Sequence, residues 1–136
     1  MSAVAKQWGF TYIFCNDLDS MKWFYTEILR LKLIWDNNMS IAYKIGEHQL
    51  SIAFNEDFNP QSQKFAIQPG WKGGTEPRIS WSIECAKKDF IEIVQSVDAN
   101  DVPKFYNEPQ WTGYWSFPIL DPMNNTLEIT CTEENI

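Results

Sequence analysis

The two halves of this 136-residue chain show the same order of apolar patterns. Each half opens with an alternating segment that is typical of a strand, continues with apolar residues at helical spacing, and ends with three more strand-like segments. The first unit covers residues 8–55 and the second covers residues 78–132. The sequence therefore predicts one α+β domain over residues 1–136, made of two strand–helix–strand–strand–strand (βαβββ) units.

One helix is predicted in each unit, because apolar residues recur every three or four positions and gather on one face. Asp17 or Asp19 is the expected N-cap of the first helix. Asn100 is the expected left-handed residue at the end of the second. The apolar faces consist of Met21, Phe24, Tyr25, Ile28 and Leu29 in the first helix and of Phe90, Ile93, Val94 and Val97 in the second.

Strands are predicted near residues 8–15, 31–35, 40–45 and 49–54 in the first unit and 78–85, 102–106, 114–120 and 126–131 in the second. Side chains along a strand alternate between its two faces. In most of these strands one set is apolar and must pack beneath a helix, so the other set lines the concave side of the sheet. The concave set includes Phe10, Tyr12, Phe14, Ser51, Arg78, Ser80 and Glu128.

Residues 56–77 interrupt the repeat, because they are polar and rich in glycine and proline. The segment is longer than the usual connection between elements. Two interpretations are open. The segment is a plain solvated linker, or it covers the mouth of the cavity or a neighbouring subunit.

The net charge of −7 argues against a nucleic-acid partner, which requires clustered Lys and Arg. No apolar run is long enough for a membrane span or resembles a signal peptide, so a cytoplasmic protein is expected. Three scattered cysteines then predict reduced, buried thiols. Seven tryptophans in so short a chain favour a cavity with aromatic walls.

Two segments resemble one known family. Residues 9–29 run from a strand through Asp17 into a helix that carries Phe24 and Tyr25. Residues 115–129 form a strand, an Asp-Pro turn and a strand that bears Glu128. Together they resemble the vicinal oxygen chelate superfamily of glyoxalases, bleomycin resistance proteins and extradiol dioxygenases. The resemblance implies curved mixed sheets around a cavity with helices outside, and often a homodimer.

Metal-bearing relatives place His, Glu or Gln at four positions that correspond here to Phe10, Ser51, Arg78 and Glu128. Phe cannot bind a metal, and Arg is a fixed cation that repels one. One carboxylate and a hydroxyl hold a divalent ion too weakly. We therefore expect no metal and no other cofactor. The single histidine, His48, is interpreted as a turn residue.

The resemblance places Arg78 and Glu128 opposite each other across the cavity. They are expected to form an ion pair or to orient a polar group of a ligand, and the sequence leaves both open. We interpret the chain as a metal-free binder of a small organic ligand such as a drug or metabolite. The competing hypothesis is a lyase, isomerase or dioxygenase with atypical or no metal ligands, in which Glu128 is a general base.

Residues 106–115 resemble the Pro-Trp-Gly segment that borders the ligand groove in bleomycin-resistance-like members. Trp111, Tyr114 and Trp115 are therefore expected near the ligand. Asp121 is interpreted as a turn former and not as a catalytic acid. The full set of expected ligand contacts is Phe10, Tyr12, Phe14, Ser51, Arg78, Ser80, Trp111, Tyr114, Trp115 and Glu128.

Overall fold

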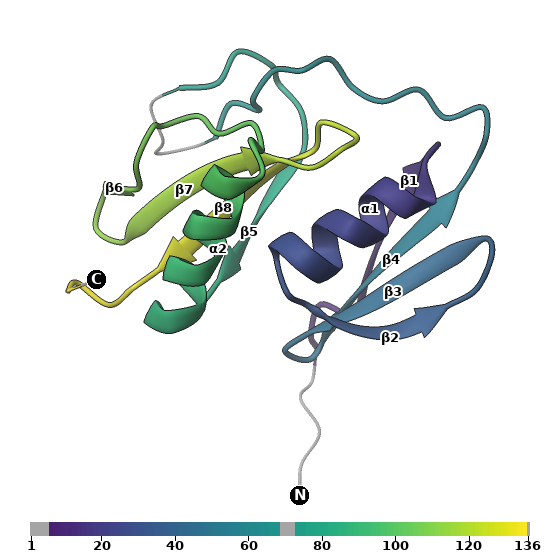
Figure 1. Ribbon diagram of the computed structural model, residues 1–136, viewed down its shortest axis with the longest axis horizontal. Helices are drawn as coiled ribbons and strands as arrows, with labels where there is room; N and C mark the ends of the chain where they lie inside the picture. Colours follow the sequence, from purple (N-terminus) through teal and green to yellow (C-terminus); the bar gives the residue numbers. More distant parts are fainter. Residues whose placement is uncertain (1–5, 69–72, 136) are drawn as a thin grey trace, which may run out of the picture. The chain divides into compact units, whose positions relative to one another are not determined.

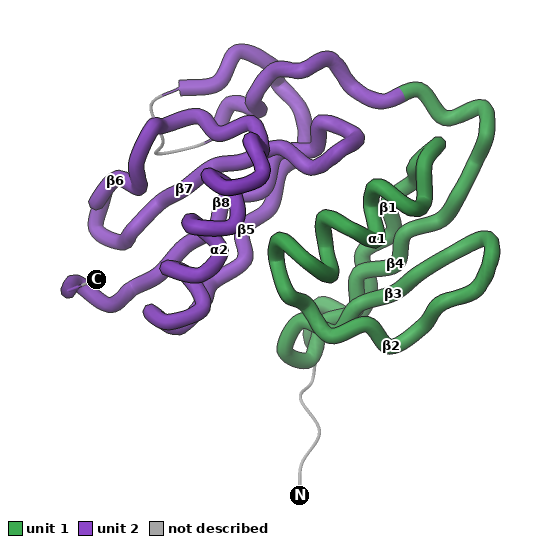
Figure 2. The backbone as a smooth tube through the Cα atoms, viewed as in Figure 1, with its two compact units in different colours: residues 1–59 green, residues 60–136 purple. Residues whose placement is uncertain are grey.

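The computed structural model of the protein describes residues 6–68 and 73–135 (Figure 1). The chain divides into two compact units, residues 1–59 and 60–136 (Figure 2). Each unit contains one four-stranded mixed sheet and one helix that packs on it. The predicted α+β fold of two βαβββ units is confirmed. No helix among the described residues is long and apolar enough to cross a membrane.

The sheet of unit 1 has the strand order β1-β4-β3-β2, with β1 parallel to β4 and the other pairs antiparallel. Its elements are β1 (Phe10–Cys15), α1 (Leu18–Trp23), the π-helical turn η1 (Phe24–Ile28), β2 (Lys32–Asp36), β3 (Ser40–Ile45) and β4 (His48–Phe54). Asp17 is the N-cap of α1, because its Oδ1 accepts the backbone N–H of Ser20 at 3.1 Å. The predicted apolar helix face is buried, together with Ile41, Tyr43, Leu50 and Ile52 of the sheet.

The sheet of unit 2 has the corresponding order β5-β8-β7-β6. Its elements are β5 (Ser80–Glu84), α2 (Lys87–Ala99), β6 (Gln110–Trp111), β7 (Trp115–Leu120) and β8 (Thr126–Cys131). Phe90, Ile93 and Val97 of α2 are buried, as are the apolar side chains of β8. Ala86, the residue at the N-cap position of α2, has no side chain that can cap the helix. The Glu133 carboxylate accepts the backbone N–H of Lys87 at 2.7 Å instead.

Two local predictions in unit 2 are wrong. The expected strand at residues 102–106 is not a strand: Lys104 makes an isolated bridge to Ile119, and the edge strand of the sheet is β6. Pro103 has no N–H with which to continue a ladder. The left-handed residue after α2 is Asp101 (φ 52°), whereas Asn100 has a φ of −113°.

The segment predicted as a linker is partly fixed to unit 2. The backbone N–H of Gln61 donates to the carbonyl of Met123 at 3.2 Å, and that of Ala66 donates to the Thr126 hydroxyl at 2.9 Å. Residues 61–66 therefore follow the end of the β7–β8 turn instead of running free in solvent. Residues 69–72 of the segment lie outside the described part of the chain.

Candidate functional site

A row of paired residues crosses the open face of the first sheet, opposite the face that α1 covers. The row consists of Tyr12, Ser51, Ala42 and Trp35, on β1, β4, β3 and β2 in that order. Paired residues of adjacent strands point to the same side of a sheet. Tyr12 is 69% exposed and Trp35 is 56% exposed, whereas the two residues between them are small. We call this row the trough, because it carries an exposed aromatic side chain at each edge and small side chains between them.

The β1 edge of this trough carries three exposed aromatic side chains, as the alternation predicted. Phe10, Tyr12 and Phe14 all point to the open face, and the ring centroids of Phe10 and Tyr12 are 6.2 Å apart. Rings held on a strand lose little conformational freedom when a ligand binds. This edge can therefore serve as a stacking surface.

Trp35 at the opposite edge was missed by sequence reasoning. The pairing of β2 with β3 shifts between Leu33 and Trp35, and this bulge places Trp35 opposite Ala42. Its indole N–H donates to the Ser40 hydroxyl at 3.0 Å, so the ring leans along β3. That position accounts for the burial of Ala42, which is only 3% exposed on an otherwise open face.

A second row lies beside the first and ends in cations. It consists of Phe10, Gln49, Lys44 and Lys32. Gln49 donates from Nε2 to the Ser51 hydroxyl at 3.0 Å, which ties the polar groups of the two rows together. Both lysines are exposed and have no carboxylate partner among the residues that the structure describes. The trough thus has a cationic end.

In unit 2, Glu128 occupies the middle of the sheet face that points away from α2. It is 5% exposed and pairs with Ser82 and Pro118. The Ser116 hydroxyl donates to its Oε2 at 2.5 Å, and the Tyr114 hydroxyl donates to the same oxygen at 3.1 Å. The other oxygen, Oε1, has no hydrogen bond to the described residues. Glu128 is thus an oriented carboxylate with one oxygen that lacks a partner in this part of the chain.

The environment of Glu128 also changes the titration of Tyr114. Burial raises the pKa of Tyr114 above its usual value, and the charge and hydrogen bond of Glu128 raise it further. Both effects disfavour the phenolate, because it would be desolvated and would lie beside a carboxylate. Tyr114 therefore remains a hydrogen-bond donor to Glu128 well into the alkaline range.

We expect Glu128→Gln to lower the pKa of Tyr114 without returning it to the ordinary value of about 10. The carboxylate charge is removed, whereas burial, the largest cause of the shift, remains. The change can be followed by NMR titration of the Tyr114 ring between about pH 8 and pH 12. Glu84→Gln, on β5, is the matched control and should leave this titration unchanged. An unaltered Tyr114 titration in Glu128→Gln would contradict the assigned hydrogen bond.

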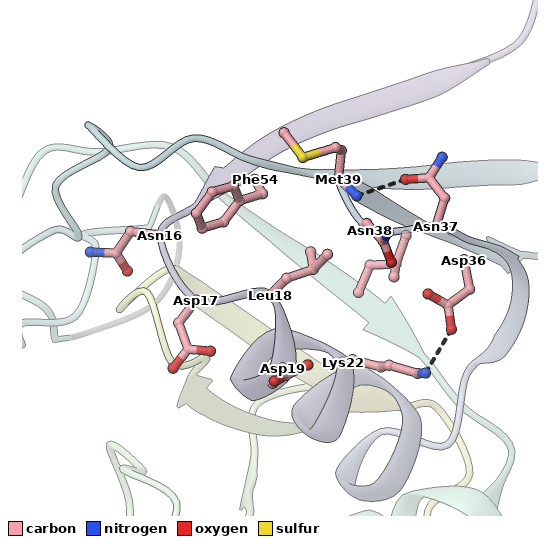
Figure 3. A pocket seen from close by; sticks show the side chains of 11 residues that line it. Asn16, Asp17, Leu18, Asp19, Lys22, Asp36, Asn37, Asn38, Met39 and Phe54 are labelled. Carbon is pink, nitrogen blue, oxygen red and sulfur yellow. Dashed lines mark hydrogen bonds and ion pairs between the residues drawn. The ribbon is translucent and has the colours of Figure 1, made fainter.

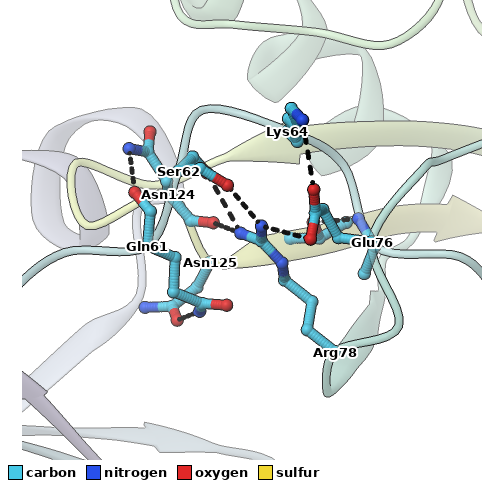
Figure 4. Close-up of polar contacts among 9 residues, drawn as sticks. Gln61, Ser62, Lys64, Glu76, Arg78, Asn124 and Asn125 are labelled. Carbon is cyan, nitrogen blue, oxygen red and sulfur yellow. Dashed lines mark hydrogen bonds and ion pairs between the residues drawn. The ribbon is translucent and has the colours of Figure 1, made fainter.

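Arg78 does not pair with Glu128, which corrects the sequence expectation. Its guanidinium donates from Nη1 to the carbonyl oxygens of Ser62 (3.1 Å) and Asn124 (3.4 Å). Nη2 donates to the Ser62 hydroxyl at 2.8 Å and lies 3.7 Å from a carboxylate oxygen of Glu76 (Figure 4). Arg78 therefore joins the segment at residues 61–66 to the β7–β8 turn.

The strand register explains this difference. Tyr12 pairs with Ser51 in unit 1, and Ser82 pairs with Glu128 in unit 2. The sequence repeat aligns Phe10 with Arg78 and Ser51 with Glu128. With Ser51 matched to Glu128, these pairings make Ser80 the structural equivalent of Phe10, so the alignment of Phe10 with Arg78 is two residues out. Arg78 lies four residues before Ser82, which corresponds to about 13 Å along an extended chain.

The three aromatic residues expected together near the ligand lie on two faces. Tyr114 shares the face of Glu128. Trp115 pairs with Cys131, whose side chain belongs to the set that packs toward α2. Trp111 pairs with Trp115, and their ring centroids are 5.5 Å apart at 66°. The two tryptophans therefore belong to the helix side of unit 2.

A polar pocket of about 440 Å³ lies at the end of unit 1 where β1 leads into α1 (Figure 3). Phe54, Leu18 and Met39 contribute its apolar part. Its acidic side chains include Asp17, which caps α1, and Asp36, which pairs with Lys22 at 2.6 Å. Because the carboxylates of Asp17 and Asp36 are already partnered, only the third, that of Asp19, is left to contact a ligand among the described residues.

Comparison with known proteins identifies the fold family. The model of the glyoxalase/bleomycin resistance protein/dioxygenase superfamily matches residues 7–129. The chain belongs to this superfamily. A comparison with curated protein sequences gave no significant match.

Solved structures share the fold at low sequence identity. A glyoxalase/dioxygenase from Nostoc punctiforme is 15% identical with a TM-score of 0.76, over 98% of this chain and 99% of that one. Fosfomycin resistance protein FosX from Mesorhizobium loti is 11% identical (TM-score 0.66; 97% and 96% covered). Lactoylglutathione lyase from Agrobacterium tumefaciens is 18% identical (TM-score 0.59; 96% of both).

The residues of this superfamily member do not fit the metal that many relatives hold. Phe10 and Ser51 occupy two of the expected ligand positions, and the register gives Ser80 for the third. No group of three or more His, Cys, Asp or Glu in the described ranges could hold a metal ion. His48 is also engaged, since its Nε2 shares a hydrogen bond with the Thr11 hydroxyl (2.7 Å) and its Nδ1 lies 3.3 Å from the Trp8 carbonyl oxygen.

Proposed function

We propose that this protein binds a planar aromatic anion in the trough on the open face of its first sheet, without a metal ion. The observation that carries the proposal is the row from Tyr12 to Trp35, with large rings at its edges and small side chains between them. Contiguous exposed aromatic surface on a soluble fold favours a binding site over a solvated face.

The dimensions of the trough favour a flat ligand. The outer strands β1 and β2 are separated by three strand spacings, or about 14 Å. The floor is low at Ser51, and the Trp35 ring covers Ala42 beside it. A ligand with two or three fused rings can lie over Ser51 and contact Tyr12 on one side and the Trp35 ring on the other.

The charge of the ligand is inferred from the second row. Lys44 and Lys32 are adjacent at one end of the trough and lack carboxylate partners in the described part of the chain. An anionic group such as a carboxylate would relieve their mutual repulsion. Arg78 was the residue first expected to bind such a group, but its donors are already used by the backbone and hydroxyl of Ser62.

A second function, proton transfer by Glu128, is favoured by one observation. Its Oε2 is held by Ser116 and Tyr114, while Oε1 is left without a partner among the described residues. An oriented carboxylate is suited to act as a general base. Relatives named for a lyase activity and for fosfomycin resistance support small-molecule chemistry in this superfamily. The homodimer and the cytoplasmic location expected from the sequence stay predictions.

Titration with 2-naphthoate tests the proposed trough. Tyr12→Leu and Trp35→Leu should each weaken binding by about three- to tenfold, the range expected for loss of one aromatic contact. Lys44→Gln should weaken binding by up to about fivefold, since the charge is exposed. Calorimetry gives the affinities, and turnover of a bound ligand would be detected by NMR of the mixture.

Trp23→Leu is the matched control, because Trp23 is also exposed in unit 1 but lies on α1. It should leave the affinity unchanged. Equal affinities for wild type and both trough variants, with intact circular dichroism, would place the ligand elsewhere and overturn the proposal.

A further inference from the structure

A groove of about 380 Å³ lies on the helix side of unit 2, on the face opposite Glu128. The residues that line it are Phe90, Ile91, Val94, Gln95, Glu108, Pro109 and Trp115. Its volume falls within the range of small-molecule sites, which begins at about 300 Å³. The groove contains the tryptophan that the sequence assigned to a ligand and that the trough does not use.

One wall of the groove is the indole of Trp115. Its N–H donates to the carbonyl oxygen of Glu134 at 3.1 Å, so the only polar atom of the ring is satisfied. Trp111 contacts it edge to face and is 42% exposed. The pair therefore offers aromatic surface, and no unpaired donor, to a ligand.

The opposite wall is a flank of α2. The side chains of Phe90, Ile93 and Val97 on this helix are buried, whereas those of Ile91 and Val94 are only half-buried. The apolar surface of this helix therefore extends past the face that packs on the sheet. Its additional residues, Ile91 and Val94, line the groove together with Pro109 and Trp115. Apolar side chains arranged in this way favour a ligand with an apolar body.

The polar side chains of the groove determine the charge of that ligand. Glu108 and Gln95 are exposed, and neither side chain has a hydrogen-bond partner in the part of the chain that the structure describes. The nearby cation Lys104 is bound to Asp98 and to the Asn107 carbonyl oxygen. A carboxylate accepts hydrogen bonds and donates none. The ligand must therefore bring the donor and the positive charge.

We propose that this groove binds an organic cation with an aromatic body and a protonated amine. The body would lie between Val94 and Trp115, where the ring face also attracts cations. The ammonium group would bind Glu108. The net charge of −7 raises the local concentration of such ligands.

Titration with 1-naphthylmethylammonium tests the site, followed by NMR of the indole N–H groups. The Trp115 and Trp111 signals should shift on binding, and the Trp35 signal should not. Val94→Trp, which fills the groove from a half-buried position on the helix flank, should abolish binding. Glu108→Gln should weaken binding by up to about fivefold, as expected for an exposed charge.

Two controls test the role of charge. The first removes the charge of the probe, and the second removes a protein charge away from the groove. Neutral 1-naphthalenemethanol should bind wild type and Glu108→Gln equally. Glu56→Gln removes the same charge from unit 1 and should leave the affinity for the cation unchanged. Binding to Val94→Trp with wild-type affinity, shifts confined to Trp35, or no binding at millimolar concentration would each overturn the proposal.

Discussion

Replacement of Asp121 by alanine is expected to lower the free energy of unfolding by about 3–4 kcal/mol, because it leaves two buried N–H groups without an acceptor. Asp121 is 2% exposed. Its Oδ1 accepts the backbone N–H groups of Met123 and Asn125, both at 2.9 Å. Its Oδ2 accepts from the Asn125 side-chain amide at 2.9 Å. Urea denaturation followed by circular dichroism measures the change.

Asp121→Asn is the matched control, since its amide oxygen can still accept the two backbone N–H groups. We expect it to cost about 1 kcal/mol, mainly through the lost charge-assisted bond to Asn125. A loss below 1 kcal/mol in Asp121→Ala would show that the turn does not depend on this carboxylate. The sequence expectation that Asp121 forms the turn would then be wrong.

Alternation along strands was enough to predict much of the candidate site. The odd and even positions of β1 and β8 separate apolar from mixed side chains, so Phe10, Tyr12 and Glu128 could be placed on the faces opposite the helices. The role of Asp121 followed from an Asp-Pro pair at the start of a turn. These predictions needed only local information, because the period of a strand is fixed.

Predictions that depended on register or on loops could not be made from local patterns. The bulge that brings Trp35 onto the open face leaves no clear signal in the sequence. Residues two positions apart on a strand point to the same face of the sheet. Alternation therefore could not reveal that the alignment of Arg78 with Phe10 was wrong by two residues. Trp111 and Trp115 were placed by resemblance alone, and the strand pairing of β6 with β7 decides their side.

The position of Arg78 leads to a prediction that separates stability from binding. We expect Arg78→Ala to lower the free energy of unfolding by about 2–3 kcal/mol, because it removes charged donors from a side chain that is only 12% exposed. The bonds lost are those to Ser62, Asn124 and Glu76 (Figure 4). Residues 60–68 should become sensitive to limited proteolysis, since Arg78 ties this segment to the turn.

Binding of 2-naphthoate by Arg78→Ala should stay within about twofold of wild type, because the cations assigned to that ligand are Lys44 and Lys32. Lys64→Ala is the control for the same network, and its exposed ion pair with Glu76 is worth less than about 1 kcal/mol. A loss of naphthoate affinity of tenfold or more in Arg78→Ala, with stability unchanged, would restore Arg78 as the anion-binding residue. Unchanged affinity with reduced stability would instead show that Arg78 stabilises the fold and does not bind this ligand.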